Sequence, residues 1–110
     1  MPITKRDSVF QFRDLYSGLI RLHILHHAAE EPVFGLEMAQ ELARHGYQIS
    51  PGTLYPLLHG LEKKGYLRSS EKRQGQTIRK FYRATPLGRK ALAAMKIKVG
   101  ELFGEMHESH

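Results

Sequence analysis

The stretch from Ser50 to Gly65 constrains the fold of this chain most, because its apolar residues occupy one narrow face of a short helix. These residues recur at the i, i+3, i+4 and i+7 spacing of such a face, and they are Leu54, Leu57, Leu58 and Leu61. The opposite face carries only small or polar groups, namely Gly52, Pro56, His59 and Lys63, flanked by Tyr55 and Gly60. We expect the leucines to be buried and Tyr55, His59 and Lys63 to be exposed. Taken alone, the stripe fits an ordinary core helix better than a helix that lies in a groove.

The start of this helix has two candidate caps. Ser50 followed by Pro51 is a usual helix opening, but it places Pro56 beyond the first turn, where proline removes a backbone hydrogen bond. If Thr53 caps instead, Pro56 falls at the third helical position, where its missing N–H costs no intrahelical bond. Either start leaves free backbone N–H groups at the helix N-terminus, and these favour a phosphate.

The composition suits one globular domain over residues 1–110. Of the 110 residues, 41% are hydrophobic and 25% are charged, which is enough apolar material for a modest core. No apolar run approaches the roughly 20 residues of a membrane-spanning helix, and the N-terminus lacks the apolar block of a signal peptide. We therefore expect a cytoplasmic protein with no membrane partner. The absence of cysteine excludes disulfides and thiolate metal sites.

The positive charge is concentrated in one part of the chain. The formal net charge is +6 and the sequence pI is about 9.8, which favours a polyanionic partner. Between Lys63 and Lys90 the single acidic residue is Glu71. The basic residues there are Lys63, Lys64, Arg68, Lys72, Arg73, Arg79, Lys80, Arg83, Arg89 and Lys90. This one-sided block indicates a surface for nucleic acid, while the acidic last ten residues indicate a different contact.

Two helices are expected around a turn that leads into the central stretch. The first, over 7–30, is apolar on nearly every side between Leu19 and Leu25, which favours contact with another subunit. The second carries its apolar face at Leu36, Ala39, Leu42 and Ala43. Pro32–Gly35 is expected to be a short connection, and Gly46 stands where a left-handed C-cap would fall. A short helix, a glycine turn and a helix that opens on Ser-Pro form a helix-turn-helix pattern.

A β-hairpin is expected after this pattern. Its strands, 66–70 and 77–84, are rich in β-formers and flank a polar turn over 72–76. On the second strand one face carries Ile78, Tyr82 and Ala84, and the other carries Arg79, Phe81 and Arg83. We expect Tyr82 to pack inward and the arginines to face outward. We favour a DNA-binding wing over a solvated edge hairpin, so that residues 35–84 form a helix-turn-helix with a β-hairpin wing.

A last helix is expected over 85–108, with Thr85 as its cap and Pro86 in its first turn. Its apolar residues step by three, four, three and four, as in a coiled coil, and they are Leu92, Met95, Val99, Leu102 and Met106. A single helix with such a seam needs a partner. The sequence therefore predicts a dimer formed by this helix and the over-wide apolar face of the first one.

We find no catalytic constellation, and we expect neither enzyme activity nor a cofactor. The chain has no phosphate-cradling glycine motif, no nucleophile elbow and no paired carboxylates in an apolar setting. His23, His26 and His27 offer imidazoles one turn apart on the first helix, with Glu30 a turn beyond His26. A metal site usually needs a third ligand and a supporting shell. The sequence therefore favours surface or interface histidines over a metal site.

Two runs of residues carry a resemblance to a known family. The first is Gly46-Tyr47-Gln48-Ile49-Ser50-Pro51-Gly52-Thr53-Leu54-Tyr55-Pro56-Leu57-Leu58, continued by Leu61-Glu62-Lys63-Lys64-Gly65-Tyr66-Leu67, and the second is Arg79-Lys80-Phe81-Tyr82-Arg83-Ala84-Thr85-Pro86-Leu87-Gly88. With them the chain resembles the PadR family of transcriptional regulators, in its compact branch with one helix after the wing. The resemblance implies a mainly α (α+β) winged helix-turn-helix. It also implies a homodimeric repressor that binds an inverted repeat in double-stranded DNA, with the first and last helices forming the dimer.

The patterns and the resemblance together give three groups of candidate site residues. Expected DNA contacts are Ser50, Gly52, Thr53, Tyr55, Pro56, His59, Lys63, Lys72, Arg73, Arg79 and Lys80. Expected dimer contacts are Phe12, Tyr16, Leu19, Leu92, Met95, Val99, Leu102 and Met106. A small-molecule effector pocket at the dimer interface, which the resemblance implies, would be lined by Phe10, Phe12, Tyr16 and Phe103, although aromatics there are more often only core. The effector itself stays open.

A function of a different kind, as a protein-interaction module, also stays open. A winged helix can serve as a protein-interaction module, whose basic face here would bind an acidic partner protein. Salt distinguishes the two readings, because a DNA complex weakens steeply and log-linearly with added salt and prefers one sequence.

Overall fold

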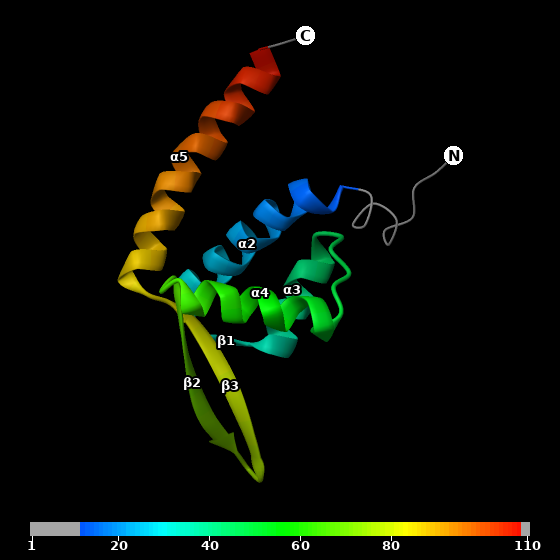
Figure 1. Cartoon of the computed structure of the whole chain (residues 1–110), viewed down its shortest axis with the longest axis vertical. Coiled ribbons are helices and arrows are strands. Elements are labelled where there is room, and N and C mark those ends of the chain that lie inside the picture. Colours follow the sequence, from blue (N-terminus) through cyan, green and yellow to red (C-terminus); the bar gives the residue numbers. More distant parts are fainter. Residues whose placement is uncertain (1–11, 109–110) are drawn as a thin grey trace, which may run out of the picture.

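The structure, a computed structural model, describes residues 12–108. Its elements are α2 (Arg13–Glu30), β1 (Val33–Phe34), α3 (Gly35–Arg44), α4 (Pro51–Lys63), β2 (Leu67–Gln74), β3 (Thr77–Ala84) and α5 (Pro86–Glu108). The molecule is elongated, 55 × 35 × 21 Å, because α5 and the β2–β3 hairpin extend from the body in opposite directions (Figure 1). Within the described range, the helices fall short of the length and apolarity that crossing a bilayer requires.

Helices α2, α3 and α4 and the base of the hairpin enclose the core. Its buried residues come from all of these elements and are Ile20, Ile24, Leu25, Ala28, Val33, Met38, Leu42, Leu54, Leu58, Leu61, Leu67 and Tyr82. Helix α5 adds Leu92, which is partly buried against them. The predicted helix-turn-helix with a hairpin behind it is confirmed, and α5 leaves this core after its first turns.

The segment between α2 and α3 is a strand, so the expected plain connection is wrong. β1 pairs antiparallel with β3, with Val33 opposite Tyr82 and Phe34 opposite Phe81, and the sheet has three strands in the order β1-β3-β2. Val33 is buried under the helices. A strand of two residues is too short to display an alternating pattern, which is why the sequence did not reveal it.

Glycine ends both helices of the helix-turn-helix, as expected for Gly46. Gly46 after α3 and Gly65 after α4 have φ angles of 89° and 88°, the left-handed conformation that only glycine adopts without strain. In each case the next N–H reaches back five residues to a helix carbonyl, as from Tyr47 to Leu42 at 3.0 Å. These are Schellman motifs, which fix where each helix ends and how the chain leaves it.

The first turn of α5 is fixed to the turn that follows α4. The Thr85 hydroxyl donates to the carbonyl of Gly65 at 2.5 Å and accepts from the N–H of Gly88 at 3.0 Å, which confirms Thr85 as a cap. Gly88 is buried, and a methyl group there would clash with the carbonyl of Tyr66. The direction in which α5 leaves the body is therefore set by contacts within the chain.

The expected seam of α5 is exposed in the single chain. Met95 is 42% exposed and Leu102 is 55% exposed, and Val99 and Met106 are exposed in the same way. A row of large apolar side chains on one helix is unusual on a monomer surface, and such rows are common where two protein surfaces meet.

Candidate nucleic-acid interface

Helix α4 starts at the first of its two candidate caps. Ser50 is the N-cap, Pro51 is the first helical residue, and the N–H groups of Thr53 and Leu54 donate to the Ser50 carbonyl at 3.0 and 2.9 Å. The Ser50 hydroxyl lies 3.4 Å from the Thr53 hydroxyl and caps no backbone N–H. Pro56 consequently stands inside the helix, beyond the first turn. The helix N-terminus at the protein surface keeps free N–H groups, which suits a phosphate.

The two faces of α4 agree with the expected orientation, with one difference. Leu54, Leu58 and Leu61 are buried, whereas Leu57 is half-buried. On the opposite face Tyr55 is 41% exposed, and Gly52, Pro56, His59 and Lys63 are exposed. The rings of Tyr55 and His59 lie side by side, with centroids 6.4 Å apart. The helix thus offers small, polar and aromatic groups outward along its whole length.

Tyr55 packs against the start of α3, a contact that sequence reasoning missed. A methyl group on Gly35 would come within 2.7 Å of the Tyr55 hydroxyl oxygen, so glycine leaves room for the ring. Gly35 is buried at the first position of α3. The contact holds Tyr55 in one orientation on the exposed face. No spacing rule predicts it, because the two residues are 20 positions apart and meet only in the fold.

The hairpin is longer than expected, so two basic residues belong to a strand and not to the turn. β2 runs to Gln74, and the turn consists of Gly75 and Gln76, with φ 64° at Gly75. Lys72 and Arg73, which we had placed in the turn, pair with Arg79 and Ile78 of β3. The polar run that begins at Ser70 hid the strand, since it lacks the apolar alternation of a half-buried strand.

The outer face of the sheet combines aromatic rings with cations. The rings of Phe34 and Phe81 stack edge to face at 5.7 Å, the Arg79 guanidinium lies 4.6 Å from the Phe34 ring, and the Lys72 ammonium lies 5.2 Å from the Phe81 ring. Both arginines lie on the outer face, as strand alternation predicts, but Arg79 is half-buried by its contact with Phe34, whereas Arg83 is exposed. Cation–π contacts hold Arg79 and Lys72 close to the base of the wing.

The inner face of β3 follows the expected pattern at its base. Tyr82 and Ala84 are buried against the helices, whereas Ile78 near the tip is 56% exposed. The tip extends beyond the body of the protein, as Figure 1 shows for the β2–β3 hairpin. Exposed apolar and basic side chains at a projecting tip are suited to contact with a partner surface.

A hollow of about 370 Å³ lies between the wing and α4. Its lining residues come from β1, α3, α4 and β3, and they are Phe34, Gly35, Leu36, Tyr55, Thr77, Ile78, Arg79 and Lys80. Tyr55 of α4 and Lys80 of the wing therefore face one continuous concave surface. The structure brings these two expected DNA contacts together, although they are 25 positions apart in the sequence.

Glu62 ties α4 to the wing. Its carboxylate accepts hydrogen bonds from the Ser69 hydroxyl at 2.5 Å and from the Ser69 N–H at 3.1 Å. The Ser69 hydroxyl bond is the main cause that lowers the pKa of Glu62, with burial opposing it and the charges of Lys80 and His59 adding to it. These hydrogen bonds hold α4 and the wing in a fixed relation.

We expect Glu62→Gln to lower the free energy of unfolding at pH 7 by about 1 kcal/mol, because a neutral acceptor makes a weaker hydrogen bond. The pKa of Glu62 lies below its ordinary value of 4.5. The stabilisation that the Glu62 carboxylate contributes is thus complete above pH 4.5 and is lost as the pH falls through the lower pKa of the folded state. Urea unfolding should show a smaller difference in the free energy of unfolding between variant and wild type at about pH 3 than at pH 7. An equal difference at both would contradict this account.

The expected dimer and pocket residues lie on α2 and α5, except Phe10, which is outside the described residues. The ring of Phe12, the N-cap residue of α2, lies 6.4 Å from that of Tyr16, and the Phe103 ring lies 4.2 Å from that of His107 on α5. A separate hollow of about 330 Å³ between the two helices is lined by Leu19, Leu22, His23, His26, Leu92, Lys96 and Val99. Three expected dimer residues meet there, whereas Phe12, Tyr16 and Phe103 do not line it.

Comparisons with known proteins agree with this geometry. A family model for the transcriptional regulator PadR-like family matches residues 24–94. The chain is 49% identical over 94 residues to the curated transcriptional regulator Rv3488 of Mycobacterium tuberculosis, covering 86% of this chain and 88% of that protein. A PadR family regulator structure from Eggerthella lenta has a TM-score of 0.77 and 30% identity over 94% of each chain. One from Bacillus cereus has a TM-score of 0.79 and 27% identity, covering 86% of this chain and 94% of the other.

A helix-turn-helix with a basic hairpin behind it defines a winged-helix DNA-binding fold. The solved structures share this fold, which is mainly helical with a small antiparallel sheet. The chain belongs to the PadR-like family of transcriptional regulators. It is therefore a transcriptional regulator, a function that implies DNA binding, and it is not an enzyme.

Proposed function

We propose that this protein is a homodimeric repressor that binds an inverted repeat in double-stranded DNA. The observation that carries the proposal is the continuous surface formed by the exposed face of α4 and the basic wing, with Tyr55 and Lys80 on one hollow. A helix fits the major groove, and strands with basic side chains suit the adjacent backbone or the minor groove.

The exposed face of α4 makes the base and nearby phosphate contacts. Its N-terminal residues enter the groove first, as in other helix-turn-helix proteins. The contact residues are Ser50, Gly52, Thr53, Tyr55, Pro56, His59 and Lys63. Tyr55 supplies a hydroxyl and an apolar ring edge, and His59 supplies ring nitrogens for hydrogen bonds to bases.

The wing acts mainly through charge. Lys72, Arg73, Arg79 and Lys80 neutralise phosphates, and Arg79 also keeps the wing against Phe34 of β1. These contacts add affinity without selecting a sequence, so that specificity comes from α4.

Two copies of the chain associate through α2 and α5. The seam residues Met95, Val99, Leu102 and Met106 are exposed in one chain, and a second copy would remove them from water. Dimerisation places two α4 helices on the same side of the duplex, about one helical turn or 34 to 36 Å apart.

The test of the proposed function is selection of bound duplexes from a genomic pool, followed by titration of the selected sequence at increasing salt. The proposal predicts one preferred inverted repeat, bound by two chains, with log affinity falling linearly with log salt. A shuffled duplex of the same length is the control. If the shuffled duplex binds equally well at every salt concentration, the basic surface serves another partner, such as an acidic protein.

We expect His59→Ala to weaken binding of the selected duplex by about 1 to 3 kcal/mol, which is about 5- to 150-fold. His59 is exposed on α4, so the free energy of unfolding should change by no more than about 0.5 kcal/mol. Fluorescence anisotropy with the selected and shuffled duplexes measures the effect. Equal loss on both duplexes, or no loss, would remove His59 from the base-reading face.

We expect Arg73→Ala to lower affinity for all duplexes alike, because a phosphate contact carries no sequence information. The slope of log affinity against log salt should fall by about one unit. Lys98→Ala is a suitable control, since Lys98 is exposed on α5, which extends from the body in the direction opposite to the hairpin (Figure 1). A slope equal to that of wild type would mean that the wing is only a charged edge hairpin.

A further inference from the structure

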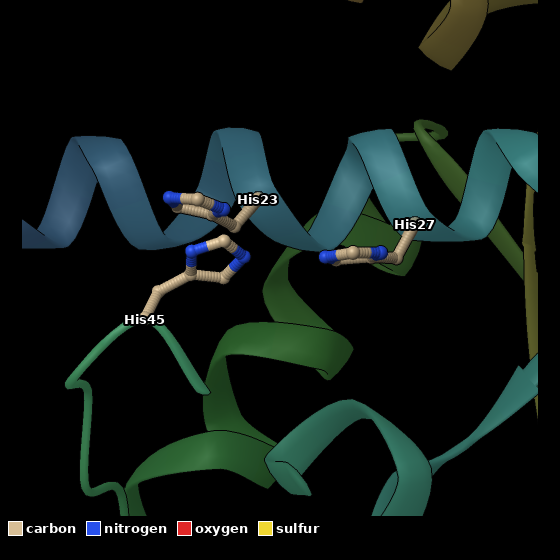
Figure 2. A group of neighbouring side chains, drawn as sticks. All are labelled: His23, His27 and His45. Atoms are coloured by element: carbon tan, nitrogen blue, oxygen red, sulfur yellow. The ribbon is translucent and has the colours of Figure 1, made fainter. Parts of the chain in front are cut away.

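Three histidine side chains meet where α2 passes the turn between α3 and α4. His23 and His27 are one helical turn apart on α2, and His45 follows α3 directly. Figure 2 shows the ring of His45 reaching from the turn towards the other two. One potential ligand atom from each residue lies within 4.8 Å of those from the others. The sequence spacing predicted only the pair on α2, because His45 comes close to it only in the folded chain.

The backbone that carries these rings is already fixed. His45 is the C-cap residue of the α3 Schellman motif, in which the following N–H of Gly46 donates to Ala43 at 3.0 Å. The His45 and His23 rings lie 4.6 Å apart, and the Tyr47 ring packs on His23 at 5.4 Å. The three rings therefore gather without any rearrangement of the helices.

The distances suit a small divalent ion. Zinc–nitrogen bonds of about 2.0 to 2.1 Å in tetrahedral geometry hold the ligand nitrogens about 3.4 Å apart. The ligand atoms lie within 4.8 Å of one another, so they would have to approach by at most about 1.4 Å to reach that separation. Two histidines at i and i+4 on one helix, joined by a third ligand from another element, form a usual zinc-binding arrangement.

One ring nitrogen of the cluster, Nε2 of His27, is buried without a hydrogen-bond partner among the described residues. The nearest carboxylate oxygen to it belongs to Glu41, 3.9 Å away. A buried nitrogen without a partner is costly unless a ligand binds it.

We propose that His23, His27 and His45 bind a divalent transition-metal ion of the zinc type, with water completing its coordination. A second group, His26, His27 and Glu30, shares His27 and is the competing assignment. It is the weaker one because His26 and Glu30 are 57% and 62% exposed at the end of α2, and both come from the same helix as His27. The site with His45 joins two elements, so the fold itself brings its ligands together.

Metal binding at this position links the dimer helix to the recognition helix. α2 belongs to the proposed dimer interface, and the turn at His45 leads directly into α4. An ion that holds α2 to this turn therefore restrains the position of α4 relative to its copy across the dimer. This regulatory role rests on the proposed function. The ion is then the effector of DNA binding and changes the affinity for DNA by about 5-fold or more.

The site is tested by calorimetric titration of the full chain with Zn²⁺. We expect one ion for each chain, and His45→Ala should weaken binding by at least about 100-fold. His45 is exposed on a turn, so the variant should stay folded, which circular dichroism checks. The matched controls are His26→Ala, which removes the competing site, and His107→Ala on α5. Binding unchanged in His45→Ala but lost in His26→Ala would overturn the assignment, as would no binding to the wild type.

The coupling is tested separately by titrating the selected duplex with and without Zn²⁺, using EDTA in the metal-free arm. We expect the affinity of the wild type to change by about 5-fold or more and that of His45→Ala to stay constant. Zinc binding without any change in DNA affinity would overturn the effector role. Sequence-specific DNA binding by a chain that binds no zinc would overturn the metal site and leave the proposed function standing. Absence of specific DNA binding would overturn the proposed function, while the zinc titration still decides the site.

Discussion

Replacing Met95 and Leu102 together with glutamate should leave a monomer that binds its operator little better than random DNA. Both side chains are exposed in one chain and are buried in the proposed dimer. Two unpaired carboxylates on each subunit would then enter an apolar interface, at a cost that most interfaces cannot absorb. Losing the second half-site should lower operator affinity by about 1,000-fold or more. Sedimentation equilibrium and duplex titration measure the two effects.

The control for this variant is Lys98→Glu, which changes the net charge by the same two units. Lys98 is outside the seam residues and 72% exposed, where it pairs with Glu101 at 3.2 Å. An exposed pair of this kind contributes little, so the control should stay dimeric. If the double glutamate variant also stayed a dimer with full operator affinity, the subunits would have to meet elsewhere, and the role given to α5 would be wrong.

Leu58→Ala should reduce the free energy of unfolding by about 2 to 5 kcal/mol. Leu58 is fully buried, at 0% exposure, in the core shared by α2, α3, α4 and the sheet. The substitution removes apolar contacts and leaves a cavity. The loss is large because the whole free energy of unfolding of a domain is only about 5 to 15 kcal/mol. Urea unfolding followed by circular dichroism measures the loss.

Leu57→Ala is the matched comparison, because it makes the same chemical change one position away. Leu57 is half-buried, so its truncation should cost clearly less than that of Leu58. Equal losses at the two positions would mean that α4 is rotated from the orientation described here, and the exposed face assigned to DNA would have to change with it.

The helices and their ends were the part of the fold that sequence could predict. The leucine stripe set the orientation of α4, and the glycines at 46 and 65 marked helix ends because only glycine accepts their positive φ. Thr85 and Pro86 marked the start of α5 for similar local reasons. These signals work because each depends on neighbours within one turn of helix or one cap.

The sheet was predicted less well, since its pairing is not local. β1 has two residues and no readable period, and the far half of β2 is a polar run that shows no alternation. Strand alternation correctly places Arg79 on the outer face, but its contact with Phe34 appears only when β1 joins β3. Errors of this kind arise wherever the partner strand is unknown.

In the candidate site too, the local features could be predicted from sequence and the non-local ones could not. The outward residues of α4 follow from helical spacing, whereas the hollow that unites Tyr55 with the wing requires the tertiary fold. The histidine cluster is the clearest case, because sequence spacing paired His23 with His27 and left out His45, 18 positions further on. A third ligand from another element turns a pair of surface histidines into a candidate metal site.

The measurement that tests the central claim most directly is binding of the selected duplex before and after its half-sites are moved apart by about five base pairs, half a helical turn. If two α4 helices of one dimer read the two half-sites together, the insertion rotates one half-site to the far side of the duplex. Affinity should then fall towards that of the shuffled sequence, and an insertion of about ten base pairs should restore the rotational alignment. Unchanged affinity with the five-base-pair insertion would contradict the account, because a dimer with fixed recognition helices cannot reach both half-sites.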